Sequence, residues 1–196
     1  MKILKIQRKL QQVGIKIFTF IEFKRIIGGT KISARKILER YTKKKFFIRL
    51  KNGLYCCSFN LPSVWMTSNY LIRPSYISYE TALSYYGIIP ETVYSTTSAT
   101  TKKPEVIKNI LGSFVYHHLT REVFLGYSPL KHQDETILIA EPEKALADYL
   151  FLVFLKKKRM NERLNLKKIS KSKLLNFAKL YKPTTFYRWV KNVIIT

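Results

Sequence analysis

The 196-residue sequence predicts an α+β fold, in which an N-terminal winged helix-turn-helix precedes a mixed α/β domain with a helical C-terminal tail. Within residues 19–58 a helix, a glycine turn, a second helix and a hairpin follow one another, which is the order of a winged helix. Beyond residue 75, runs rich in β-forming residues alternate with helical signals. We therefore divide the chain into residues 1–60, a linker or short helix at 61–75, and residues 76–196.

The first elements of the chain are expected to lead into the helix-turn-helix and to form its first helix. Residues 2–13 carry apolar side chains at helical spacing and predict a helix, and residues 15–18 suggest a short strand. Thr19 and Glu22 form a capping box, because the Thr hydroxyl accepts from an exposed helix N–H and the Glu side chain reaches back. The helix that starts there ends at Gly28-Gly29, which allows a tight turn.

The next helix is expected from Ser33 onward, because apolar side chains recur at i, i+3, i+4 and i+7. These side chains are Ala34, Ile37, Leu38 and Tyr41. The opposite face is mostly cationic and carries Arg35, Lys36, Glu39, Arg40 and Lys43. Two strand-like runs follow at residues 46–50 and 54–58. Between them Asn52-Gly53 predicts a type I′ turn, since both residue types tolerate positive φ.

Proline and serine signals divide the second half of the chain. Pro62 is expected to open a short helix that ends before Pro74, and Ser78 is expected to cap the next helix. Runs of β-forming residues predict four strands, at residues 92–101, 113–119, 123–127 and 136–140. Pro142, flanked by carboxylates, suits the first turn of a long helix, and the tail beyond it is expected to be helical.

The net charge of +24 is concentrated at the two ends of the sequence. Residues 1–72 hold 16 Lys and Arg against 2 Asp and Glu, residues 73–150 hold 7 against 9, and residues 151–196 hold 13 against 1. The expected partner is a polyanion that binds the cations of both ends of the chain. The two basic ends either fold towards one another to form one surface or form two separate faces. We expect no membrane association, because no apolar run approaches the ~20 residues that span a bilayer. Adjacent Cys56 and Cys57 suit a reducing compartment, so the expected location is the cytoplasm.

No catalytic constellation stands out in the sequence, and we expect neither an enzyme nor a bound metal or cofactor. His117 and His118 are adjacent, so on a strand they point apart, and we interpret them as structural histidines with satisfied hydrogen bonds. Three carboxylates lie around one helix start, at Glu141, Glu143 and Asp148. Stabilisation of the helix dipole and a Lys144–Asp148 pair at i,i+4 explain them more simply than a metal site does.

Three stretches of the second half together resemble one family. They are residues 76–87 (YISYETALSYYG), the Thr-rich run at 94–101, and residues 139–148 (IAEPEKALAD). With them the chain resembles, over nearly its whole length, the AbiEi-like antitoxins of type IV toxin–antitoxin (abortive infection) systems. The resemblance implies a phage-defence protein that binds its own operator DNA and represses its operon. It also implies that residues 76–196 counteract a nucleotidyltransferase-like toxin without forming a stable complex with it.

The expected DNA-binding surface comprises the basic helix, the residues after it and the hairpin: Thr30, Lys31, Ser33, Arg35, Lys36, Arg40, Lys43, Lys44, Lys45, Arg49, Lys51 and Asn52. Arg35 and Arg40 are the expected base readers, because a guanidinium bonds both acceptors of a guanine edge. Thr30, Lys31 and Ser33 are expected to hold phosphate, and Lys51 and Asn52 to touch the backbone or minor groove. A secondary surface is expected in the tail at Lys156, Lys157, Lys158, Arg159, Lys171 and Lys173. We expect monomers to bind cooperatively to inverted repeats upstream of the operon.

Two other classes of function stay open at this point. One is a winged-helix transcriptional regulator, or an RNA-binding accessory protein, that has no toxin partner. The other is a metal-dependent nuclease that uses Glu141, Glu143 or Asp148. A downstream nucleotidyltransferase-like reading frame favours the antitoxin, and cleavage of nucleic acid that depends on a divalent metal favours the nuclease.

Overall fold

The computed structural model describes residues 2–193 and has a mixed α+β architecture with two sheets. The α-helices are α1 (Ile3–Val13), α2 (Phe20–Ile27), α3 (Lys31–Lys43), α4 (Val64–Leu71), α5 (Tyr79–Tyr85), α6 (Pro142–Phe154), α7 (Lys171–Ala178) and α8 (Thr185–Val193). The strands are β1 (Ile17–Thr19), β2 (Phe47–Lys51), β3 (Leu54–Cys57), β4 (Ser75–Ile77), β5 (Ser95–Thr100), β6 (Glu105–Asn109), β7 (Gly112–His118), β8 (Tyr127–His132) and β9 (Glu135–Ala140). A short 3₁₀ helix, η1 (Leu166–Lys168), precedes α7.

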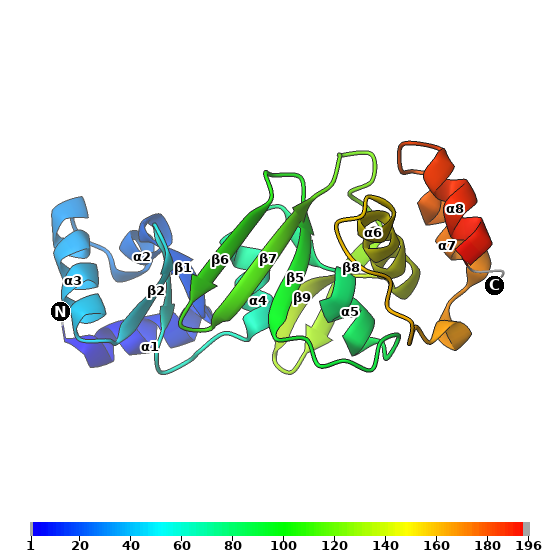
Figure 1. Cartoon of the computed structure of the whole chain (residues 1–196). Helices are drawn as coiled ribbons and strands as arrows, with labels where there is room; N and C mark the ends of the chain where they lie inside the picture. The colour runs from blue at the N-terminus through cyan, green and yellow to red at the C-terminus, as the bar shows by residue number, and fades with distance from the viewer. Residues whose placement is uncertain (1, 194–196) are drawn as a thin grey trace.

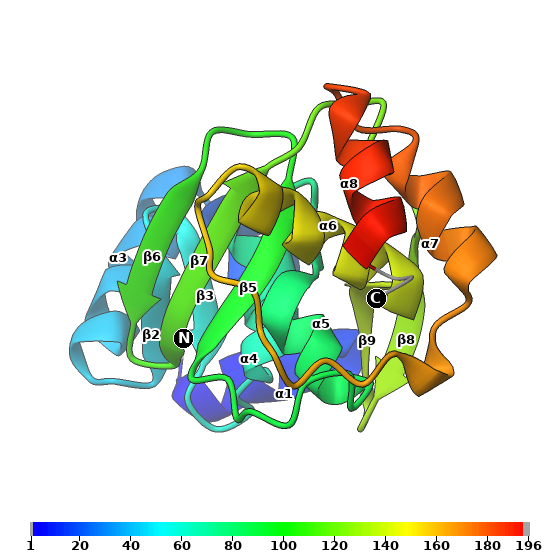
Figure 2. The same ribbon diagram turned by 45° about the vertical axis from the view of Figure 1, so that its right-hand side comes forward.

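The two basic parts of the chain lie at opposite ends of the molecule. Figure 1 shows α1–α3 with the small sheet at one end, the large sheet in the middle, and α7 and α8 at the other end. The turned view in Figure 2 keeps α3 and the C-terminal helices on opposite sides. Of the two arrangements expected from the charge pattern, the described residues therefore form the one with separate basic surfaces.

The N-terminal region, residues 3–57, packs three helices against a three-stranded antiparallel sheet of order β1-β3-β2. The predicted capping box is confirmed: the backbone N–H of Glu22 donates to Thr19 Oγ1 (3.3 Å), and the Thr19 N–H donates to Glu22 Oε2 (2.7 Å). A core of aromatic and aliphatic side chains holds the region together. Its fully buried members include Ile6, Leu10, Phe18, Phe23, Ala34, Leu38 and Phe47.

The hairpin between β2 and β3 differs from the predicted type I′ turn. That turn needs positive φ at both central residues, whereas here Gly53 has φ 75° and Asn52 does not have positive φ. The register shifts so that Arg49 pairs with Tyr55 and Lys51 with Leu54, which inserts one extra residue in β2 as a β-bulge. Asn-Gly thus predicted the position of the hairpin but not its bulged turn.

The large sheet has the strand order β6-β7-β5-β4-β9-β8. β4 runs parallel to β9 and β5 parallel to β7, and the other neighbours are antiparallel. The strand predicted at 123–127 is wrong, because residues 120–125 form tight turns in which the N–H groups of Val123 and Phe124 donate to the Thr120 carbonyl. Three strands, β4, β6 and β8, were not predicted.

Helices cover both faces of this sheet. Adjacent residues of β5 point to opposite faces: Ser98 Oγ lies 2.8 Å from Ser68 Oγ of α4, whereas Thr97 Oγ1 donates to Thr81 Oγ1 of α5 (3.0 Å). α6 packs beside α5, and α7 and α8 pack in turn on α6 (Figure 2). The fully buried core of this layer includes Ile77, Leu83, Ala99, Ile139 and Leu146.

The N-terminal region is joined to the large sheet by an apolar interface and a buried carboxylate. Side chains from β1, β2, β3, α4 and β7 form one cluster, whose buried members are Ile17, Leu50, Leu54, Cys56, Leu71, Ile72, Phe114 and Tyr116. Glu135 is 4% exposed, accepts from the Ser63 N–H (3.1 Å) and forms an ion pair with Lys16 (2.8 Å). This contact fixes the position of the basic end relative to the rest of the chain.

A buried polar network ties α6 to the C-terminal helices. The predicted i,i+4 pair of Lys144 and Asp148 is confirmed, but both side chains are 0% exposed, and Tyr181 hydrogen-bonds to both of them. The Ser78 hydroxyl makes no cap for α5, contrary to the prediction, and instead donates to Asp148 Oδ2 (2.6 Å). Burial lowers the pKa of Lys144 and, with the charge of Asp148, raises the pKa of Tyr181.

Candidate nucleic-acid interface

α3 is held by its buried face and presents its cationic face outward. Ala34, Leu38 and Tyr41 are buried in the core of the N-terminal region. The predicted contact residues on the other side are exposed, namely Lys31, Arg35, Lys36, Arg40 and Lys43. The exposed surface of α3 therefore carries a dense positive charge that a phosphate backbone would neutralise.

The N-terminus of α3 is capped by the side chain of Thr30. Thr30 Oγ1 accepts from the Ser33 N–H (3.2 Å), and the Ser33 hydroxyl donates to the Thr30 carbonyl (2.9 Å). Thr30 and Ser33, two of the three residues whose side chains were predicted to hold phosphate, are therefore used within the cap. Lys31, which is exposed in the first turn, is the residue of this group whose charge points to solvent.

The turn between α2 and α3 is stabilised by α1. Gly28 and Gly29 have φ 74° and 89°, and residues that carry a Cβ rarely adopt such positive values of φ. Lys9 Nζ donates to the carbonyls of Ile26 (3.3 Å) and Ile27 (3.1 Å), which are among the last carbonyls of α2. The two glycines and the contacts of Lys9 thus define the turn that joins the two helices.

The two arginines predicted to read bases both lie over aromatic rings. The Arg35 guanidinium carbon is 5.8 Å from the centre of the Phe20 ring, on α2. The Arg40 carbon is 4.7 Å from the Tyr41 ring, and Arg40 Nη2 donates to the Tyr41 hydroxyl (3.3 Å). Such contacts reduce the number of side-chain conformations, so each guanidinium is offered in a restricted geometry.

The hairpin is less available than the sequence suggested. Lys51 Nζ donates to the Leu71 carbonyl at the end of α4, and Arg49 Nη2 donates to Asn52 Oδ1 (2.7 Å). Lys51, expected at the hairpin tip to touch DNA, is therefore tied to the large-sheet layer. Lys44 and Lys45, in the turn between α3 and β2, are exposed and lie beside the cationic face instead.

The secondary surface predicted in the tail is far from α3. Lys158 is half-buried and forms an ion pair with Glu80, whereas the remaining cations are exposed. These exposed residues are Lys156, Lys157, Arg159, Lys171 and Lys173. Lys156, Lys157 and Arg159 follow α6 beside the large sheet, and Lys171 and Lys173 lie on α7 at the end opposite α3 (Figure 1). The structure therefore does not bring the two predicted surfaces together.

The carboxylates considered for a nuclease have separate roles. Asp148 belongs to the buried network, and Glu143 Oε1 accepts from the Ser170 N–H (3.0 Å), which joins α6 to the start of α7. Among residues 2–193, no group of three or more His, Cys, Asp or Glu side chains is arranged to hold a metal ion.

Sequence reasoning missed one group of polar residues on the large sheet. His117 was expected to have satisfied hydrogen bonds, but its buried Nε2 has no hydrogen-bond partner, so that expectation is wrong. The ring of His117 packs edge-on against Tyr79 of α5, 4.7 Å between centres. Its position beside a cavity depends on contacts between β7 and α5, which no local sequence pattern indicates.

No protein-family model matches the sequence, and no curated protein matches it either. Within the part of the chain that the structure describes, the helices are too short or too polar to cross a membrane.

Proposed function

We propose that this protein is a DNA-binding antitoxin of a type IV toxin–antitoxin system, which represses its own operon and counteracts a nucleotidyltransferase-like toxin. In this proposal residues 3–57 act as a winged helix-turn-helix, and α3 enters the major groove of operator DNA. The observation that carries the proposal is the cationic face of α3, which is fully exposed on a helix fixed by its cap and its buried stripe.

The antitoxin part of the proposal is supported by the stretches that resemble AbiEi-like antitoxins. Residues 76–87 form most of β4 and α5, and residues 139–148 form the end of β9 and the start of α6. The two stretches meet at Asp148, which accepts from both Tyr76 (3.2 Å) and Ser78 (2.6 Å). Residues that carry the resemblance thus form one buried structural unit, which accounts for their occurring together.

Arg35→Ala is expected to weaken binding to the operator by ~1–3 kcal/mol and binding to unrelated duplex DNA much less, because a guanidinium that reads a base contributes only at the correct sequence. Arg40→Ala is expected to act in the same direction. Gel shifts at one salt concentration, with the DNA upstream of the gene and an unrelated duplex, measure both affinities. Arg8→Ala, which removes an exposed arginine of α1, is the control.

Equal weakening on both DNAs would show that this face does not read sequence. RNA of the same sequence is included in these gel shifts, and preferential binding to it would favour an RNA-binding accessory protein over an operator-binding repressor.

Protection against the toxin is expected to survive the loss of DNA binding. When the neighbouring nucleotidyltransferase-like gene is induced, a chain with Arg35→Ala and Arg40→Ala should rescue growth as well as the unchanged chain does. The reason is that α3 lies at one end of the molecule, whereas the residues that resemble antitoxins belong to the large sheet and the helices packed on it (Figure 1). Counts of viable cells, with both genes on separate promoters, measure the rescue. Failure of the variant, at equal protein level, would contradict the division of roles between the two parts.

A further inference from the structure

Unpartnered polar atoms gather at one place on the large sheet. Among the described residues, four buried side-chain polar atoms have no hydrogen-bond partner, and three belong to Tyr79 (Oη), Glu80 (Oε2) and His117 (Nε2). Tyr79 and Glu80 are neighbours at the start of α5, and the Tyr79 ring contacts the His117 ring. Buried polar groups are nearly always hydrogen-bonded, so three such atoms close together offer hydrogen-bonding positions to a polar ligand.

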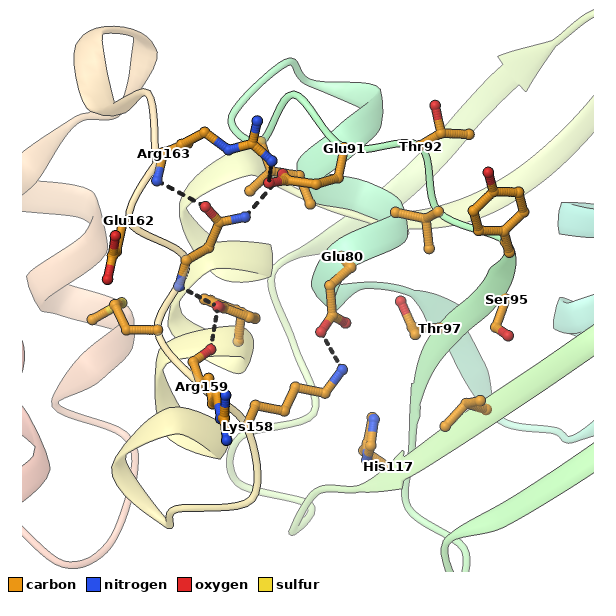
Figure 3. A pocket seen from close by; sticks show the side chains of 17 residues that line it. Glu80, Glu91, Thr92, Ser95, Thr97, His117, Lys158, Arg159, Glu162 and Arg163 are labelled. Carbon is orange, nitrogen blue, oxygen red and sulfur yellow. Dashed lines mark hydrogen bonds and ion pairs between the residues drawn. The ribbon is translucent and has the colours of Figure 1, made fainter.

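Glu80 and His117 line a cavity of about 860 Å³ (Figure 3). Its walls come from β5, β7, the start of α5, the segment 89–94 and the segment 158–163, and α6 contributes Tyr149. Tyr149 fixes the last of these segments, because its hydroxyl donates to the Arg159 carbonyl (2.8 Å) and accepts from the Asn161 N–H (2.9 Å). The volume falls in the range of ~300–1,000 Å³ that small-molecule sites occupy.

The mouth of the cavity carries three cations on one segment. Lys158, Arg159 and Arg163 line it together with the carboxylates Glu91 and Glu162. Arg163 pairs with Glu91 Oε1, and Figure 3 shows Lys158 pointing across the cavity to Glu80. Lys158 pairs with Glu80 Oε1, which leaves Oε2 without a donor. Burial, and then the charge of Lys158, lower the pKa of His117 to about 4, so this ring is neutral near pH 7.

We propose that this cavity binds a nucleotide, with the base against Glu80 and His117 and the phosphate on Lys158 and Arg159. A base edge offers N–H donors for the free carboxylate oxygen of Glu80 and a ring nitrogen or carbonyl for the neutral imidazole of His117. The phosphate matches the cations of the 158–163 segment. Tyr94, which is 94% exposed and lines the cavity, supplies an aromatic face on which a base stacks.

Binding requires one local movement. The free atoms of Glu80 and His117 are covered in this structure, and Lys158 occupies the other oxygen of Glu80. A phosphate at the mouth draws the Lys158 ammonium away from Glu80, and the N–H of the base takes its place. Free phosphate has neither the N–H donors of a base edge nor a ring that stacks on Tyr94, so the arrangement favours a nucleotide over a simple anion.

The test is a calorimetric titration of the nucleotide-free full chain with AMP, GMP, CMP and UMP. At least one is expected to bind with a dissociation constant below ~100 µM, and inorganic phosphate and the matching nucleoside to bind at least ~10-fold more weakly. Arg159→Ala and Glu80→Gln are each expected to weaken the nucleotide by ~10-fold. Arg188→Ala removes the same charge from the exposed face of α8, outside the lining, and is expected to have no effect.

The proposal is overturned if no nucleotide binds with a dissociation constant below about 1 mM, the order of magnitude of a weak site. It is also overturned if phosphate binds as tightly as the nucleotide, or if Arg159→Ala and Arg188→Ala have equal effects. Circular dichroism and the urea midpoint of each variant show that it is folded, so that a lost signal is assigned to the site. Because the cavity and α3 share no residues, these outcomes do not depend on DNA binding.

Discussion

Lys144→Met is expected to lower the free energy of unfolding by ~3–5 kcal/mol, because it leaves the Asp148 carboxylate buried without its cation. Methionine fills a similar volume, so the loss of charge rather than a cavity causes the effect. Asp148 keeps hydrogen bonds from Tyr76, Ser78 and Tyr181, yet hydroxyl donors alone do not compensate a buried full charge. Urea unfolding of the full chain, followed by circular dichroism, measures the change.

The matched variant is Lys144→Met combined with Asp148→Asn, which removes the charge and keeps an acceptor oxygen. We expect this double variant to recover more than half of the lost stability, since replacement of both members of a buried pair is tolerated far better than loss of one. Lys191→Met, at an exposed lysine of α8, should change the stability by less than ~0.5 kcal/mol. If the single and double variants unfold at the same urea concentration, the buried charge is not the cause.

This network illustrates what the sequence could predict and what it could not. The spacing of Lys144 and Asp148 on one helix is a local property, and the pair was predicted from it. Its burial depends on Tyr181, 33 residues further along the chain, and on Ser78, 70 residues back. No periodicity near residue 148 indicates these partners, so the sequence predicted the ion pair but not the buried network around it.

The same limit explains the strands. Helices α1, α2, α3 and α6 were predicted close to their observed bounds, because caps and apolar stripes are local signals. β4 has three residues and is defined by pairing with β5 and β9, so it carries no pattern of its own. Residues 123–126 have β-forming residues but no partner strand, and they fold into turns, so only Tyr127 of the predicted run belongs to a strand, β8. Strand propensity was informative only where a neighbouring strand existed.

The charge pattern predicted a polyanion surface but not its layout. The apolar interface around Leu50 and Leu54, together with the Glu135 contact to Lys16, fixes the N-terminal region on the side of the sheet away from α7 and α8. A duplex docked on the exposed face of α3 therefore reaches the tail only if it follows the whole length of the molecule (Figure 1). This layout leads to a prediction on salt dependence.

Replacement of Lys43, Lys44 and Lys45 by Ala is expected to reduce the slope of log K against log salt by ~2.7, because each phosphate contact on duplex DNA contributes ~0.9. The matched variant replaces Lys157, Lys171 and Lys173, which removes the same charge from surfaces away from α3. It should leave the slope within ~0.5 of that of the unchanged chain, since only direct contacts release counterions. The affinity for the DNA upstream of the gene, measured at salt concentrations between about 50 and 200 mM, gives both slopes. Equal reduction by the two triple variants would show that DNA contacts both basic ends, and that the duplex wraps or bends along the molecule.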